Sequence, residues 1–189
     1  MKTSVSTHKL PGYGSTLRTA RRLTEQAVRL VNRAVVGRMP DVEVVLTTER
    51  GMVDLMAAAD IALAGHADRR ALNRAVRQSR RTARDCQARA IPKPDGGALV
   101  LIDADKHRTP AAFAVTLVHE LVHAMQFSRR GVRERIVRDT RAALGVERQT
   151  GRQAREHLRL LKQEENEAYG CEHLADQLIP GATTTATAA

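Results

Sequence analysis

The stretch TPAAFAVTLVHELVHAMQF, residues 109–127, is the most informative part of this 189-residue chain. Thr109 is a favoured N-cap, and proline is favoured at the first helical position that follows. Apolar side chains then surround nearly the whole circumference, which predicts a buried helix. Its polar residues fall on one stripe at helical spacing: Thr116, His119, Glu120, His123 and Gln126. A polar stripe on a buried helix requires something that satisfies it.

Three residues of this stripe form the pattern HExxH: His119, Glu120 and His123. Histidines four residues apart project from one helix face, so both imidazoles reach a single Zn²⁺ at about 2.0–2.1 Å. Glu120 lies beside them and suits a general base that takes a proton from metal-bound water and passes it to the leaving amine. The alternative is two unrelated histidines and a solvated glutamate on a surface helix. The apolar residues around the pattern argue against it.

A catalytic zinc ion takes three protein ligands and keeps one position for water. The metzincin extension would place a histidine six residues after His123, but Arg129 stands there, which excludes that class. An acidic cluster, EENEAYGCEHLAD over residues 164–176, supplies candidates in the last predicted helix. The candidates for the third ligand are Glu164, Glu165, Glu167, Glu172 and a downstream histidine.

The pattern HELVH followed some forty residues later by a helical glutamate resembles the gluzincin group of zinc metallopeptidases. The string EENEAYGCE is also similar to a segment of HExxH domains in bacterial effector and toxin proteins. This resemblance implies that Glu165 is the third ligand, with Ala168 as the small residue that lets two active-site helices approach. A competing match to thermolysin-like enzymes implies Glu167 instead, and Glu164 stays a further alternative.

The sequence departs from the gluzincin pattern beside the ligand, because Tyr169 stands where an aspartate is usual, four residues after Glu165. We expect Glu172 to orient a ligand histidine instead. Tyr169 and His173 are candidates for stabilising the oxyanion. Residues 98–102 are expected to form the edge strand that pairs with an extended substrate in such enzymes.

The whole sequence predicts an α+β fold: a mostly helical, zincin-like single domain with a small mixed β-sheet and two active-site helices. The domain is expected to span residues 16–180, after a flexible N-terminal segment over 1–15 and before a disordered tail over 181–189. Periodicity and β-branched runs place the other elements. Helices are predicted over 17–36, 51–64, 68–90 and 152–178, and strands over 41–48 and 98–103.

Composition narrows the class of protein further. Lys and Arg total 31 against 21 Asp and Glu, a formal charge of +10, and the chain has two cysteines, four Tyr and Phe together and no Trp. A disulfide-stapled scaffold and an aromatic platform for single-stranded nucleic acid are therefore excluded. No signal peptide and no membrane span are predicted. We expect a cytoplasmic protein, and the resemblance adds the option of delivery as an effector.

The expected function is that of a zinc-dependent metallopeptidase acting on a peptide or protein substrate. One alternative is a SprT-like, nucleic-acid-associated protease, which uses a third histidine, for which His157 or His173 is available. Another is a non-catalytic, basic helical module that binds nucleic acid or an acidic protein and holds no metal. The arginine-rich segment 69–89 is the feature that fits either alternative.

Overall fold

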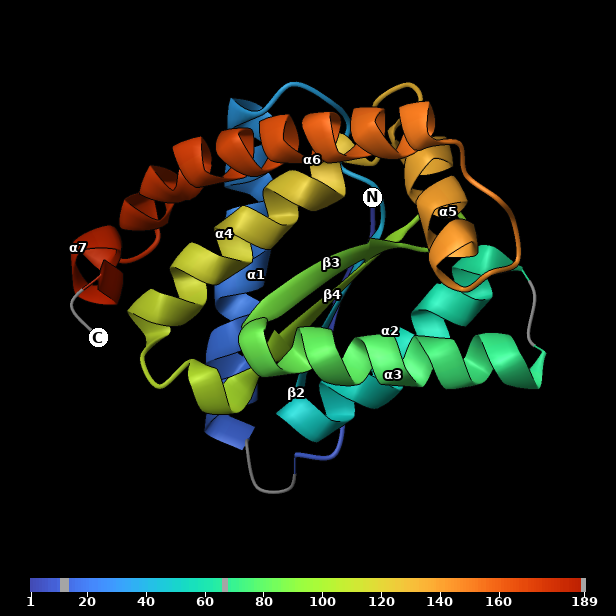
Figure 1. Cartoon of the computed structure of the whole chain (residues 1–189). Helices are drawn as coiled ribbons and strands as arrows, with labels where there is room; N and C mark the ends of the chain where they lie inside the picture. Colours follow the sequence, from blue (N-terminus) through green and yellow to red (C-terminus); the bar gives the residue numbers. More distant parts are fainter. Residues whose placement is uncertain (11–13, 66–67, 188–189) are drawn as a thin grey trace.

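The computed structural model describes residues 1–10, 14–65 and 68–187 of the chain (Figure 1). A four-stranded mixed sheet lies at the centre, in the order β1-β2-β4-β3. Strands β1 (Thr3–Thr7), β2 (Val42–Thr47) and β4 (Ala98–Asp103) are parallel, and β3 (Ala88–Pro92) is antiparallel to β4 at the opposite edge. Helices make up most of the remaining residues, so the predicted α+β class with a small mixed sheet is confirmed.

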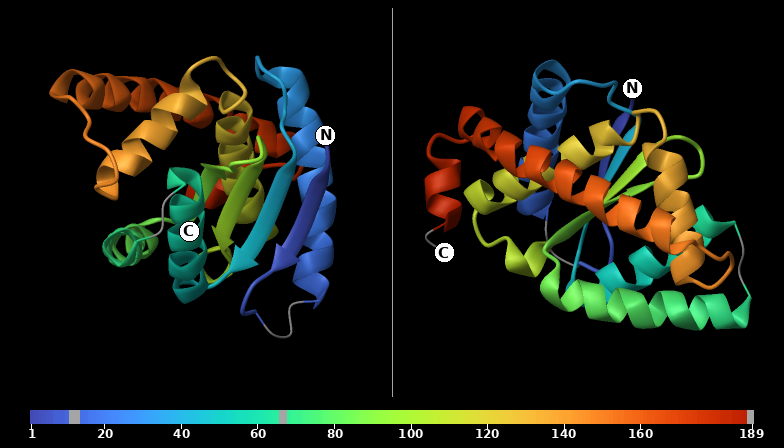
Figure 2. Two further views of the ribbon diagram at one scale, coloured as in Figure 1. Left: turned by 90° about the vertical axis from the view of Figure 1, so that its right-hand side faces the viewer. Right: turned by 45° about the horizontal axis from the view of Figure 1, so that its top comes forward.

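The two faces of the sheet carry different helices (Figure 2). On one face α1 (Gly14–Ala34) and α4 (Pro110–Gln126) enclose the main apolar core. On the other face α2 (Glu49–Ala64) covers the strands, and α3 (Arg69–Asp85) packs along α2. Only small side chains of α3 are buried there, which lets the two helices approach closely: Ala71, Ala75, Ser79 and Ala83.

Helix α4 forms as its sequence predicts. The Thr109 hydroxyl accepts a hydrogen bond from the Ala112 backbone N–H at 3.1 Å, and Pro110 occupies the first turn. The predicted strand over residues 98–103 has the bounds of β4.

The C-terminal third of the chain lies across α4. Helix α5 (Val132–Ala143) leads to α6 (Gly151–Cys171), which the 3₁₀ segment η2 (Glu172–Gln177) follows, and then to α7 (Ala182–Thr187). Figure 1 shows α6 running over α4, and the two helices are in direct contact. This crossing brings the acidic cluster to the polar stripe of α4.

Both chain ends differ from the expectation. The segment 1–15 was expected to be flexible, but residues 3–7 form β1, because Val5 and Leu10 reach the core and five residues pair with β2. The tail over 181–189 was expected to be disordered, but residues 182–187 form α7, and Ala182 is fully buried in the core that α4 also lines.

The middle of the chain contains one strand and one helix that were not expected. The helix predicted over 68–90 stops at Asp85, and the residues after it form β3. Helix α5 lies in a stretch for which no helix was predicted.

The end of α3 is held by one ammonium group. Lys106, in the short 3₁₀ segment η1 (Ala104–Lys106) after β4, donates to the backbone carbonyls of Ala83, Arg84 and Cys86, each at 2.9 Å. A cation at a helix C-terminus satisfies carbonyls that have no partner within the helix. Lys106 therefore holds the junction between α3 and β3 against the segment that follows β4.

Within the described ranges, no helix combines the length and the apolarity that crossing a bilayer requires.

Candidate metal centre

The polar stripe of α4 faces a groove of about 750 Å³. All five stripe residues line it, together with β3, the end of α3 and residues of α5 and α6. Thr116 is paired with His107, whose Nε2 lies 2.9 Å from the Thr116 hydroxyl. The other four stripe residues surround the point where α6 crosses α4. The polar stripe of α4 therefore faces one site.

His119, His123 and Glu165 converge at this point. The Nε2 atoms of the two histidines are 3.1 Å apart, and each lies 3.4 Å from a carboxylate oxygen of Glu165. Among the described residues these three form a group whose ligand atoms all lie within 4.8 Å of one another. Ala168, three residues after Glu165, is fully buried beneath the crossing, in line with the small residue that the resemblance implies.

His119, His123 and Glu165 shift one another's pKa values. Hydrogen bonds to His119 and His123 hold the pKa of Glu165 far below its usual range. Burial alone would lower the pKa of His123, but the hydrogen bond with Glu165 and the charge of Glu120 outweigh burial and raise it to about 8. The same balance raises the pKa of His119. The group is therefore arranged to hold positive charge beside a carboxylate.

Glu120 is 7% exposed and faces the edge of the sheet. Burial raises its pKa, and the nearby His123 and His119 oppose this shift. The backbone N–H of Ala90 on β3 donates to its carboxylate. Glu120 therefore lies between the two histidines and the strand that forms one wall of the groove.

His119 is oriented by residues of α6 and η2. Its Nδ1 lies 3.0 Å from a carboxylate oxygen of Glu172, the partner that the sequence predicts for a ligand histidine. The Tyr169 ring packs edge-on against the imidazole with centroids 4.8 Å apart. Tyr169 lines the groove, whereas His173 is exposed and its Nδ1 lies 2.8 Å from the Gly170 carbonyl oxygen, outside the groove lining.

His123 is oriented by Gln126 from its own helix. The Gln126 amide oxygen lies 2.8 Å from Nδ1 of His123, and the amide nitrogen donates to the Glu164 carbonyl and to the Glu167 carboxylate. Gln126 is 1% exposed, so one buried amide joins the ligand histidine to α6. The sequence places Gln126 in the polar stripe, but nothing in it indicates this bridging role.

The competing glutamates have other partners. Glu167 forms a two-point ion pair with Arg129 at 2.6 Å for both bonds, and Arg129 also donates to the Val36 carbonyl. Glu164 pairs with Arg135, which is 5% exposed. Neither carboxylate joins the histidines, so of Glu164, Glu165 and Glu167 the structure brings only Glu165 to both of them, whereas Glu172 contacts His119 alone.

Two further residues extend this network. The Arg135 guanidinium lies 2.9 Å from Nδ1 of His157, and Nε2 of His157 lies 3.4 Å from Asp139. His157 is therefore engaged with α5 and does not join His119 and His123. Sequence reasoning missed Arg135, because one buried arginine among 26 arginines and 5 lysines carries no distinguishing pattern.

The edge strand is not the one expected. Residues 98–102 belong to β4, which is interior because β3 covers its outer side. Gln87 accepts from the Asp103 N–H, and Lys93 donates to the Gly97 carbonyl, so the odd-numbered residues of β3 bond to β4. In an antiparallel pair the intervening residues point their backbone groups the other way. Ala88 and Ala90 therefore present theirs to the groove.

No protein-family model, no curated protein and no solved structure matches this chain. The candidate site therefore rests on its own geometry and chemistry.

Proposed function

We propose that the protein is a zinc-dependent metallopeptidase with a zincin-like site, in which His119, His123 and Glu165 hold the metal. One observation carries the proposal: the spacing of the two imidazole Nε2 atoms and the Glu165 carboxylate. Two zinc bonds of about 2.0–2.1 Å at a tetrahedral angle separate their ligand atoms by about 3.3 Å. The two Nε2 atoms are 3.1 Å apart, and each lies 3.4 Å from a different oxygen of the Glu165 carboxylate, so each of these contacts is close to that value.

The donor set supports zinc in particular. Two imidazoles and one carboxylate leave a fourth position open, which is the arrangement of catalytic zinc sites. The other ring nitrogen of each histidine is already bound, to Glu172 and to Gln126. Such hydrogen-bond partners hold each imidazole ring in the orientation that metal binding requires. When bound, zinc supplies a Lewis acid and lowers the pKa of a water molecule.

Glu120 performs the proton transfers in this proposal. Its carboxylate is buried beside the histidines, and burial raises its pKa toward the range that suits a base at neutral pH. It takes the proton of the attacking water and returns it to the leaving amine. Tyr169 lies beside His119 on the exposed side of the groove, where a phenol can donate to the developing oxyanion.

The outer edge of β3 supports a peptide as the substrate. The Ala88 carbonyl accepts from the Cys86 thiol and the Ala90 N–H lies at the Glu120 carboxylate, so the Ala88 N–H and the Ala90 carbonyl are the groups left along the groove. An extended peptide binds such an edge as an added strand. Their methyl side chains leave the groove open beside α4. A SprT-like arrangement is less well supported, because His157 is bound to Arg135 and Glu165 stands where a third histidine is required.

Metal analysis of protein purified without chelator tests the proposal. We expect one zinc per chain and cleavage of an unstructured protein such as casein. The His123→Ala variant should lose the zinc, and the Glu120→Gln variant should keep it and lose cleavage. Absence of bound zinc in the native protein, or full cleavage by Glu120→Gln, would overturn the proposal.

A further inference from the structure

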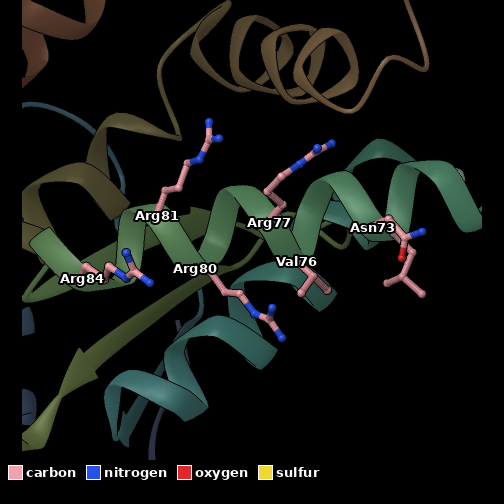
Figure 3. A pocket seen from close by; sticks show the side chains of 7 residues that line it. Asn73, Val76, Arg77, Arg80, Arg81 and Arg84 are labelled. Atoms are coloured by element: carbon pink, nitrogen blue, oxygen red, sulfur yellow. The ribbon is translucent and has the colours of Figure 1, made fainter.

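Helix α3 carries an arginine face, which we define as Arg69, Arg70, Arg77, Arg80, Arg81 and Arg84. All six side chains are exposed. Figure 3 shows Arg77 and Arg81 extending from one flank of the helix and Arg80 from the other, around a shallow pocket that Asn73 and Val76 also line. The seventh arginine of α3, Arg74, is used inside the molecule, where it donates to the Leu144 carbonyl.

The arginine face is a continuous strip along the helix. At 100° per residue its members fall within one arc, opposite the buried stripe of alanines and serine that packs on α2. A helix of 17 residues is about 25 Å long. Positive charge therefore extends along the full length of this helix and is not confined to one position.

This charge is not used by the folded protein. In the described part of the chain, none of the four guanidinium groups from Arg77 to Arg84 has a hydrogen-bond or ion-pair partner. Arginines three and four residues apart repel one another by about 0.2–0.5 kcal/mol per pair. Two more, Arg69 and Arg70, lie in the first turn, where the helix dipole disfavours cations and the N-cap Asp68 is the acidic residue beside them. The strip thus opposes folding and calls for an external anion.

The chemistry of the strip selects among anionic partners. A protein interface needs aromatic or apolar anchors, and an amphipathic membrane helix needs an apolar wedge. The exposed large apolar residue of α3 is Leu72, at 47% exposure, and the helix has no aromatic residue. A surface that binds phosphate groups requires cationic side chains and no apolar anchor. Arginine binds a phosphate with two parallel hydrogen bonds. Single strands bind chiefly through base stacking on aromatic rings, which this face lacks.

We infer that the arginine face binds the phosphate backbone of a nucleic-acid duplex, without reading its sequence. This inference does not rest on the proposed peptidase function. The strip borders the groove of the candidate metal centre, because Thr82, Asp85 and Cys86 at the end of α3 line that groove. A duplex on α3 therefore lies next to the groove mouth.

Binding of labelled duplexes of about 20 base pairs, longer than the strip, tests the inference. We expect the affinity of the native chain to fall steeply with salt concentration. The fourfold variant R77Q/R80Q/R81Q/R84Q should lower the slope of log K against log[salt] by about 3–4 units. A DNA duplex and an RNA duplex, tested in parallel, distinguish the two sources of the same phosphate backbone.

Matched variants separate the strip from net charge and from folding. R18Q/R22Q/R29Q/R33Q removes four exposed arginines from α1, which covers the other face of the sheet, and should keep the native slope. R77K/R80K/R81K/R84K should keep most of the slope, and circular dichroism should show native helix content in all three variants. The inference fails if neither duplex binds, or if the α1 variant loses as much slope as the α3 variant. It also fails if oligo-dT, a polyglutamate peptide or phosphatidylserine vesicles bind the arginine face more tightly than either duplex.

Discussion

Helices α3 and α4 have the same length, 17 residues, and opposite ways of using polar side chains. Helix α4 has no lysine or arginine, and its polar residues point inward to defined partners. Helix α3 has seven arginines, most of which point outward without a partner. The difference teaches that buried polar groups with partners in the same chain indicate a site formed within the fold. Exposed charges without such partners indicate a surface that binds another molecule.

The largest effect is expected on the α4 side, at Glu120. Replacing this carboxylate by an amide, Glu120→Gln, removes the proposed base without changing the shape of the site. Peptide cleavage should fall by about 10²–10⁴-fold, because general base catalysis contributes that much. Zinc content, measured by mass spectrometry, should stay at one per chain. Glu49→Gln at the exposed start of α2 is the control and should leave the rate unchanged.

Arginine itself provides the next test, since the same residue type occurs buried between α5 and α6 and exposed on α3. Arg135→Gln leaves the Glu164 carboxylate without its buried partner, which costs about 3–5 kcal/mol in such pairs. Arg81→Gln removes an exposed, unpartnered side chain and should change the free energy of unfolding by less than about 0.5 kcal/mol. Urea denaturation measures both. Equal effects from the two substitutions would contradict the distinction between the helices.

A double replacement separates loss of the ion pair from loss of packing. Arg135→Met combined with Glu164→Met removes both charges and keeps the volume, so it should restore most of the stability. If the double variant is as unstable as Arg135→Gln, the pair acts through hydrogen bonds that methionine cannot replace, His157 included.

Gln126 tests how far the partners in the site contribute to metal binding. Gln126→Ala removes the acceptor on Nδ1 of His123 and both bonds to α6, so zinc affinity should fall by about 10–100-fold in competition with a chelator. Gln126→Glu keeps the acceptor and loses the donor. An affinity close to native in Gln126→Glu assigns the effect to His123, and native affinity in Gln126→Ala would show that the amide is not needed.

The smallest effect concerns pH and belongs to the α4 side of the comparison. In metal-free protein the pKa of His123 is raised from 6.5 to about 8. The stabilisation is thus fully present below pH 6.5 and is lost as pH rises through 8, by at most about 2 kcal/mol. Urea titrations in chelator from pH 6 to 9 should show this decline. The His123→Gln variant should show a flatter profile, and a rise in native stability over this range would be contrary to it.

The sequence predicts some of these features because they depend on local patterns. The Thr109 cap, the buried character of α4 and the position of β4 follow from residue types at fixed spacing, and the structure confirms them. The convergence of His119 and His123 is set by one helical turn. Glu165 depended on a resemblance, since its neighbours Glu164 and Glu167 have the same chemistry and only the arginines opposite them tell the three apart.

Other features depend on contacts between distant segments, which local patterns do not contain. Strand β1 exists because residues 3–7 pair with residues 42–46, and its own sequence is polar. The first residues of β3 continue the sequence pattern of the arginine-rich helix before them, so they were predicted as part of that helix. Pairing with β4 makes them a strand. The edge of the sheet is therefore formed by residues 88–92, and not by residues 98–102 as expected, because β3 covers the outer side of β4.

The Lys106 cap has a practical consequence for chemical labelling. All three N–H donors of Lys106 are directed at carbonyl oxygens, which shield its nitrogen from an acylating reagent, so Lys106 reacts only after it has left all three. Lys162, which is exposed, reacts from the native state. The acetylation rate of Lys106 relative to that of Lys162 therefore measures how often the turn between α3 and β3 opens. Mass spectrometry of the peptide that contains Lys106 reports this opening at the end of the arginine-bearing helix, beside the strand that borders the groove.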